Sequence, residues 1–162
     1  MNQIHAPQIT FTRLSEIAPA AIAAHMSDPV MARHMPLLDG KPWDEATARA
    51  FVTAKEARWQ ADGLGHWAFL ADGRYVGWGG FQREDEDWDF GLVLTPDAFG
   101  LGQRITRLAL EWARADGRIP YVTFLLPPSR RHLGGLRRLG ATQIGEVMHD
   151  GARFLKFRLE TA

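Results

Sequence analysis

The segment that most constrains the fold runs from residue 91 to residue 113, "GLVLTPDAFGLGQRITRLALEWA". The apolar run 91–94 predicts a buried strand, and the apolar spacing over 102–117 predicts an amphipathic helix. Gly100 and Gly102 stand where the strand passes into the helix. Glycine lets backbone amides approach a ligand closely, and the first helical turn carries a partial positive charge. The junction is therefore a candidate anion site, typically for phosphate.

The glycine pair alone does not decide which phosphate, or whether any phosphate, is bound. A dinucleotide fingerprint, Gly-x-Gly-x-x-Gly, would need a glycine where Ile105 stands, and no Gly-Lys-Ser/Thr follows, so a P-loop is excluded. A tight strand-to-helix turn, in which the glycines only allow close packing, is the structural alternative.

The flanking patterns predict further helices and strands on both sides of this junction. Ser15 is expected to cap a helix over 15–28, and Asp28 the next one. "ADGR" is an Asp-Gly hairpin signal. The predicted elements are a strand over 8–14, helices over 15–28, 28–35 and 41–63, a hairpin over 65–82, a strand over 84–94, the helix over 102–117, a strand over 120–126, a helix over 129–140, and a hairpin over 141–160.

This order predicts a mixed α/β (α+β) fold in one domain spanning residues 1–162. The hydrophobic fraction of 46% and the charged fraction of 23% are ordinary for a soluble globular protein. No cysteine is present, which excludes disulfides and cysteine nucleophiles. The six histidines show no metal-ligand spacing, so we expect no metal.

Charge and hydropathy also limit the partners. The formal net charge is zero and aromatic and basic residues do not interleave, so we expect no nucleic-acid partner. No apolar run is long enough to span a bilayer, and the first residues do not form a secretion signal, so we expect no membrane partner and a cytoplasmic location. Exposed strand edges and six tryptophans are compatible with a homodimer.

Several motifs together resemble the GNAT superfamily of N-acetyltransferases, and most closely its ribosomal-protein N-terminal (alanine) acetyltransferase branch. Pro96 precedes Gly100 as in the branch's Pro-x-x-x-Gly-x-Gly, and "SDPVMARHMP" and "YVGWGGFQ" resemble its early helical segment and mid-sheet strand. "GGLRRLGATQIGEVMHDGARFLKFRL" resembles the closing helix and hairpin, with Ala141 in place of a phenylalanine. The resemblance covers nearly the whole chain and implies a mostly antiparallel, twisted sheet of about seven strands, flanked by helices and splayed between the fourth and fifth strands.

The resemblance also implies acetyl-CoA as co-substrate. Its pyrophosphate would lie on the glycine loop, and its pantetheine arm along the strand before that loop. The implied cofactor-binding residues are Leu92, Val93, Leu94, Phe99, Gly100, Leu101, Gly102, Gln103, Arg104, Ile105, Arg130 and Arg131. Asp97 stands where the family usually has Gln or Arg, and a carboxylate beside pyrophosphate is unfavourable unless it points away.

Acetylation of an amine requires removal of a proton from the amine, and a carboxylate can serve as the base. Asp89, two residues before Gly91, matches the Glu of the branch's Glu-x-Gly-Tyr pattern and is the candidate base. Many family members carry a tyrosine acid where this chain has Leu136, so Ser129 is the remaining candidate at the sulfur. His34, Trp78 and Trp88 are candidate acceptor-binding residues.

The predicted function is therefore direct transfer of an acetyl group from acetyl-CoA to a primary amine. The acidic segment "EDEDWD" favours a cationic acceptor, such as a protein N-terminus or a small-molecule amine. A non-catalytic acyl-CoA-binding module is the alternative, because Asp97 and Leu136 depart from the family pattern.

Overall fold

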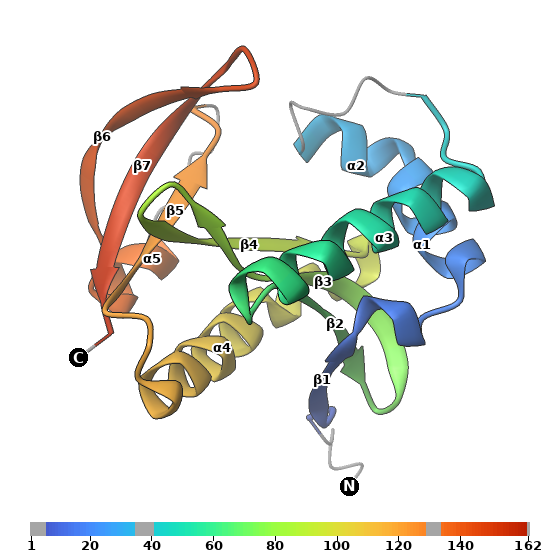
Figure 1. Cartoon of the computed structure of the whole chain (residues 1–162), viewed down its shortest axis with the longest axis horizontal. Coiled ribbons are helices and arrows are strands. Elements are labelled where there is room, and N and C mark those ends of the chain that lie inside the picture. The colour runs from blue at the N-terminus through green and yellow to red at the C-terminus, as the bar shows by residue number, and fades with distance from the viewer. Residues whose placement is uncertain (1–5, 35–40, 129–133, 162) are drawn as a thin grey trace, which may run out of the picture.

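The computed structural model describes residues 6–34, 41–128 and 134–161 (Figure 1). Within these ranges seven strands form one sheet in the order β1-β2-β3-β4-β5-β7-β6. The pairing is antiparallel throughout except between β4 and β5. The predicted mixed α/β class with a mostly antiparallel sheet is thus confirmed. The strands are β1 Ile9–Arg13, β2 His66–Ala71, β3 Arg74–Glu84, β4 Asp87–Leu94, β5 Tyr121–Leu126, β6 Thr142–His149 and β7 Ala152–Glu160.

Helices cover both faces of the sheet. The helices are α1 Pro19–Ser27, α2 Pro29–His34, α3 Glu45–Asp62, α4 Gly102–Asp116 and α5 Gly134–Leu139, with 3-10 helices η1 Leu14–Glu16 and η2 Pro96–Leu101. None of the helices in the described ranges is long and apolar enough to cross a membrane.

The two faces of the sheet build two separate cores. Trp67 belongs to the core beneath α4, whereas its neighbour Ala68 belongs to the core beneath α1 and α3. Adjacent residues of a strand point to opposite faces, which explains this division. The helical layers lie apart in the view of Figure 1, with α4 on one side of the strands and α1–α3 on the other.

The expectation that Ser15 caps the first helix was wrong. Residues Leu14–Glu16 form the turn η1, and α1 begins only at Pro19, after Ala18, which makes no side-chain capping bond. The physical reason is Pro19, which fixes its own φ at a helix-compatible value and drives the residue before it out of the helical region. Ala18 accordingly has a ψ of 128°.

The long helix α3 ends at Gly63 as predicted, but it begins at Glu45 and not at the expected Lys41. The Asp44 carboxylate accepts a hydrogen bond from the Thr47 amide at 2.7 Å, which satisfies a first-turn donor. Gly63 closes the helix in the left-handed conformation with a φ of 72°. The chain then turns directly into β2, whose first residue lies near the candidate site.

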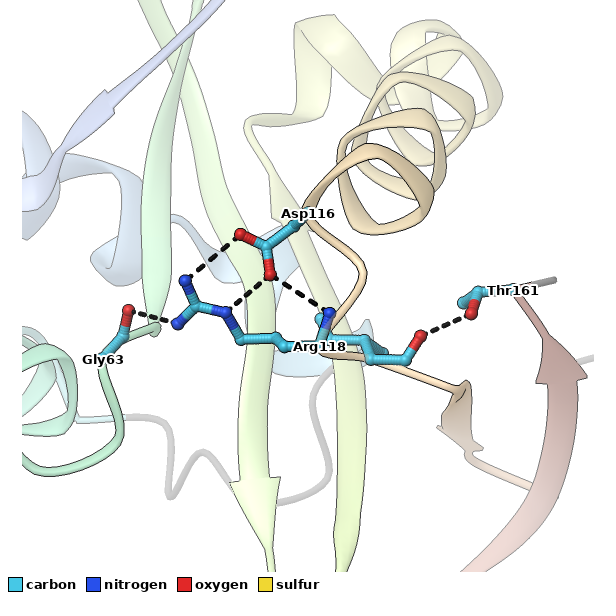
Figure 2. A network of polar contacts seen from close by, with 5 residues as sticks. Gly63, Asp116, Arg118 and Thr161 are labelled. Atoms are coloured by element: carbon cyan, nitrogen blue, oxygen red, sulfur yellow. Dashed lines mark hydrogen bonds and ion pairs between the residues drawn. The ribbon is translucent and has the colours of Figure 1, made fainter.

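A polar cluster joins the end of α3 to the turn between α4 and β5 (Figure 2). The Arg118 guanidinium donates to the Asp116 carboxylate at 2.6 Å and 3.2 Å and to the Gly63 carbonyl at 3.0 Å. On the other side of the turn, the Thr161 hydroxyl donates to the Ile119 carbonyl. These contacts fix where β5 starts relative to β2, and thereby the position of β5 beside β4.

Candidate active site

The sheet opens between β4 and β5, as the family resemblance implies. The two strands pair at a single position, Asp89 opposite Thr123, and then diverge (Figure 1). Beyond that position, residues 92–94 retain their antiparallel partners in β3. Within the described ranges no ladder partner covers their other edge. A ligand that lies along this edge can take the backbone hydrogen bonds that a neighbouring strand would otherwise make.

A cavity of about 490 Å³ occupies this opening, within the range of small-molecule sites. Two groups of residues in its lining bear on chemistry, beside apolar residues of β4 and β5 and residues of the β6–β7 hairpin. One group comes from the face of the sheet that α3 covers, and it comprises the polar side chains of His66, Gln82, Glu84 and Asp89. The other comes from the start of α4 and from α5, and it includes Gly102, Gln103, Thr106, Gly135 and Leu136.

Asp89 has the chemistry of a base that works near neutral pH. Burial raises the pKa of its carboxyl to about 7, and the negative charges of Glu84 and Asp87 act in the same direction. The Thr123 hydroxyl donates to the Asp89 carboxylate at 2.9 Å, which opposes this rise and orients the group. A carboxylate with a pKa near the working pH can both accept and release a proton.

A chain of hydrogen bonds continues from the cavity to α3. The Lys55 ammonium donates to Gln82 Oε1 at 2.9 Å, and Gln82 Nε2 donates to Glu84 Oε1 at 2.8 Å. Burial lowers the pKa of Lys55 to about 8. Gln82 is the register partner of Asp89, so the amide and the carboxylate share one face of the sheet.

The glycine loop has the form of an anion site but with one donor already used. The turn η2 runs directly into α4, and the amide of Gly102 donates to the Phe99 carbonyl. A side chain at Gly102 would start 3.7 Å from both Leu92 and Leu94 and extend toward the cavity that this glycine lines. The bare backbone at the positive end of α4 therefore fits a phosphate group.

Gln103 and Gly135 bring α4 and α5 together at the cavity. A Cβ on Gly135 would lie only 2.7 Å from Gln103 Nε2, closer than real Cβ contacts. A side chain at this position would displace the amide end of Gln103, which glycine leaves in place against α5. Both residues line the cavity, so the contact shapes the wall opposite the polar group on the sheet.

Asp97 does not leave an uncompensated charge on the loop. Arg74 donates to the Asp97 carboxylate at 2.9 Å, and the Thr95 hydroxyl donates to it at 2.6 Å. These two hydrogen bonds lower the pKa of Asp97, so it is ionised at neutral pH. The departure from the usual Gln or Arg is thus balanced by an arginine from β3.

Arg74→Ala is expected to weaken acetyl-CoA binding about two- to fivefold at low salt, because it leaves the Asp97 charge unpaired near the phosphates, and exposed charges are strongly screened. Calorimetric titration measures the change. The double variant Arg74→Ala with Asp97→Asn should recover wild-type affinity. A double variant as weak as the single one would show that Arg74 acts independently of Asp97.

The other residues predicted to bind acetyl-CoA divide between the cavity and the core. Leu92, Val93 and Phe99 line the cavity, whereas Leu94 and Ile105 are buried in the core beneath α4 and Leu101 packs against it. The Arg104 guanidinium donates to the Pro7 carbonyl instead of lining the cavity. A Cβ added to Gly100 would meet no other atom within 4 Å. Ser129, Arg130 and Arg131 lie outside the described residues.

Of the predicted acceptor-binding residues, Trp78 and Trp88 do not line this cavity. Trp78 is buried beneath α1, where its Nε1 contacts Met26 Sδ at 3.3 Å. Trp88 is buried on the opposite face of the sheet. His34 ends α2, and its side chain is not among those described. The aromatic side chains serve the core because large rings gain most from full burial.

Two further features of the wall bear on the chemistry. Leu136 lines the cavity at the position where the resemblance implies a tyrosine, and neither described tyrosine lines it. Tyr121 donates to Asp87 at 2.7 Å, and Tyr75 pairs with His25 at the same distance. The described residues include no cluster of three or more metal-ligating side chains.

Residues 9–130 match the family model described as an acetyltransferase (GNAT) domain. The fold is similar to that of a GNAT-family acetyltransferase from Bacillus anthracis (TM-score 0.72, 13% identity, 98% and 97% of the two chains covered). It is similar to a Salmonella typhimurium protein solved with its cofactor acetyl-CoA (0.67, 17%, 98% and 95%). A ribosomal-protein-alanine N-acetyltransferase from Brucella melitensis is also similar (0.69, 14%, 94% and 99%).

Proposed function

The chain belongs to the GNAT family of acetyltransferases, and on that premise we propose that it transfers the acetyl group of acetyl-CoA to a primary amine. The observation that carries the proposal is the position of Asp89. It lies at the point where β4 and β5 separate, and the pKa of its carboxyl is about 7. The candidate phosphate site at Gly102 lines the same cavity on its other side, so bound acetyl-CoA and the base would share one cavity.

Acetyl-CoA would be bound mainly by backbone groups of α4 and β4. The start of α4 around Gly102 suits the pyrophosphate, and the free edge of β4 over residues 92–94 suits the pantetheine amides. Bound acetyl-CoA supplies a thioester carbonyl that a neutral amine can attack directly. An N–H group on the β4 edge can polarise that carbonyl.

Asp89 then acts on the acceptor. An amine that enters from the side of Gln82 and Glu84 meets the Asp89 carboxylate on the same face of the sheet. The carboxylate takes the amine proton, directly or through water, while Thr123 holds its orientation. The coenzyme A thiolate is an acceptable leaving group, so the absence of a tyrosine at Leu136 is compatible with turnover.

The test is an acceptor panel read by thiol release and by the mass of the product. The panel comprises peptides with N-terminal alanine or serine, spermidine and an aminoglycoside. Acetylation of any one of them, with one thiol released per acetyl group transferred, supports the proposal. Acetyl-CoA binding without turnover of any amine would instead favour the non-catalytic acyl-CoA-binding module.

Glu84→Gln should raise the KM for a cationic acceptor several-fold and leave acetyl-CoA affinity unchanged. Glu84 lines the cavity beside Asp89, and its charge attracts an ammonium group before deprotonation. Initial rates across concentrations of a peptide with N-terminal alanine measure the change, and Glu86→Gln, in the exposed turn, is the matched control. An unchanged KM in the Glu84 variant would contradict a role of this charge in acceptor recruitment.

A further inference from the structure

His66, the first residue of β2, lies on the same face of the sheet as Asp89. It is opposite Gly80, which is in turn opposite Gly91 of β4, two residues beyond Asp89. Side chains two residues apart on a strand share a face. His66 is only 6% exposed and lines the cavity together with Asp89.

One edge of the imidazole faces the cavity because Gly91 has no side chain. A Cβ built on Gly91 would lie 3.7 Å from His66 Cε1 and 3.8 Å from Nε2. The ring also packs against Trp78, with the ring centres 5.5 Å apart. The buried Nδ1 has no hydrogen-bond partner among the described residues. The Nε2 edge is therefore the side of the ring that can meet a ligand.

The ring is neutral and has one proton to place. Burial lowers the pKa of His66 well below its usual value, and the positive charges of Lys55 and Arg58 act in the same direction. A buried N–H without an acceptor is rarer in proteins than a buried acceptor without a donor. The neutral ring is therefore expected to carry its proton on Nε2, which makes Nε2–H a donor directed at the cavity.

We propose that His66 is a specificity-determining residue, whose Nε2–H donates a hydrogen bond to an oxygen atom of the acceptor beside the attacking amine. This assignment rests on the proposed acetyl transfer at Asp89. It selects amines that carry a carbonyl or hydroxyl oxygen on a neighbouring carbon. A simple alkyl amine would leave the Nε2–H of this buried ring unpaired, and a site built to donate a hydrogen bond discriminates strongly against such analogues.

The test compares two amines of similar size, one with this oxygen and one without it. L-Alaninamide carries a carboxamide on the amine-bearing carbon, and sec-butylamine carries an ethyl group in its place. kcat/KM is determined for both and expressed per concentration of the uncharged amine, which corrects for their different basicities. The wild type should prefer L-alaninamide by roughly 10- to 100-fold.

Three variants isolate the hydrogen bond from packing. His66→Phe keeps a ring and should reduce the preference to about threefold or less, whereas His66→Gln places an amide near Nε2 and should retain most of it. Gly91→Ala is the variant that leaves His66 intact. Its methyl group would meet the ring edge at ordinary contact distance, cover Nε2 and lower the preference.

The nitrogen spectrum of the histidine rings gives a readout that does not depend on turnover. Assigned with His66→Gln, it should show His66 neutral and protonated on Nε2 at pH 7. A proton on Nδ1, or the same amine preference in the wild type and His66→Phe, would overturn the assignment. Acetyl-CoA binding with acetylation of neither amine nor of the acceptor panel would overturn the proposed function itself.

Discussion

Asp89→Asn is expected to lower kcat by about 100-fold or more while acetyl-CoA affinity stays unchanged. The carboxylate is the candidate base, and general-base catalysis typically contributes 10²–10⁴-fold. Asparagine keeps the size of the side chain and can still accept from Thr123, which donates to the native carboxylate at 2.9 Å. Steady-state kinetics and calorimetric titration together measure the two quantities. Full activity in the variant would exclude Asp89 as the base.

The pH dependence should identify the same group. Only the ionised carboxylate accepts a proton, so the ratio of wild-type to Asp89→Asn rates should rise with pH and level off above about 7. Taking this ratio cancels the ionisation of the acceptor amine itself. Thr123→Val removes the donor that favours the carboxylate, and should therefore move the midpoint to higher pH.

Asp89→Asn should also stabilise the fold at alkaline pH. Because the folded-state pKa of Asp89 is raised, to about 7 from 3.8, its stabilising contribution is complete below the unfolded value and is lost as pH rises through the folded value. Above pH 7 the buried charge costs on the order of 2–4 kcal/mol. Asparagine removes that cost, so thermal unfolding at pH 8.5 should show a higher Tm for Asp89→Asn. An equal or lower Tm would contradict the raised pKa.

Gly102→Glu is expected to weaken acetyl-CoA binding by about 100-fold or more. The new side chain would start between the ends of Leu92 and Leu94 and extend into the cavity that Gly102 lines. Its charge would oppose the phosphates at the point where the α4 dipole attracts them, and a charge pair in a partly closed site is worth several kcal/mol. Calorimetric titration measures the loss.

Two matched variants at this position separate charge from bulk. Gly102→Gln has the size of glutamate without the charge, and Gly102→Ala adds only a methyl at ordinary contact distance from its neighbours. The affinity should fall in the order Ala, Gln, Glu. A glutamate at the first turn favours the helix itself, so all three should fold. Wild-type affinity in Gly102→Glu would mean that this junction is only a tight turn.

The order of elements was predictable because its signals are local, whereas the opening between β4 and β5 was expected from the family resemblance. The dipeptides Asp72-Gly73 and Asp150-Gly151 predict two hairpin turns. Both hairpins are present, and the aspartate of each turn has a positive φ. Asp89 could also be proposed as the base, because the resemblance aligns it with the Glu of the branch's Glu-x-Gly-Tyr pattern. Its pKa could not be predicted, because burial is a property of the packed sheet.

The rest of the cavity depends on register across strands, which no local pattern reveals. Gln82 lies beside Asp89 only because β3 and β4 pair in that register. Arg74 neutralises Asp97 across 23 residues of chain, so the loop carboxylate looked more harmful in sequence than it is in the fold. Trp78 illustrates the converse, since nothing in its sequence context distinguishes a wall of the cavity from the core.

Product analysis with acetyl-CoA carrying a ¹³C-labelled acetyl group tests the central claim most directly. Wild-type protein, acetyl-CoA and the amine panel are incubated, and the masses of the amines are compared with the thiol released. The account predicts one labelled acetyl group on an amine per thiol, at a rate that Asp89→Asn reduces by about 100-fold or more. Tight acetyl-CoA binding with no labelled amine in any reaction would contradict it.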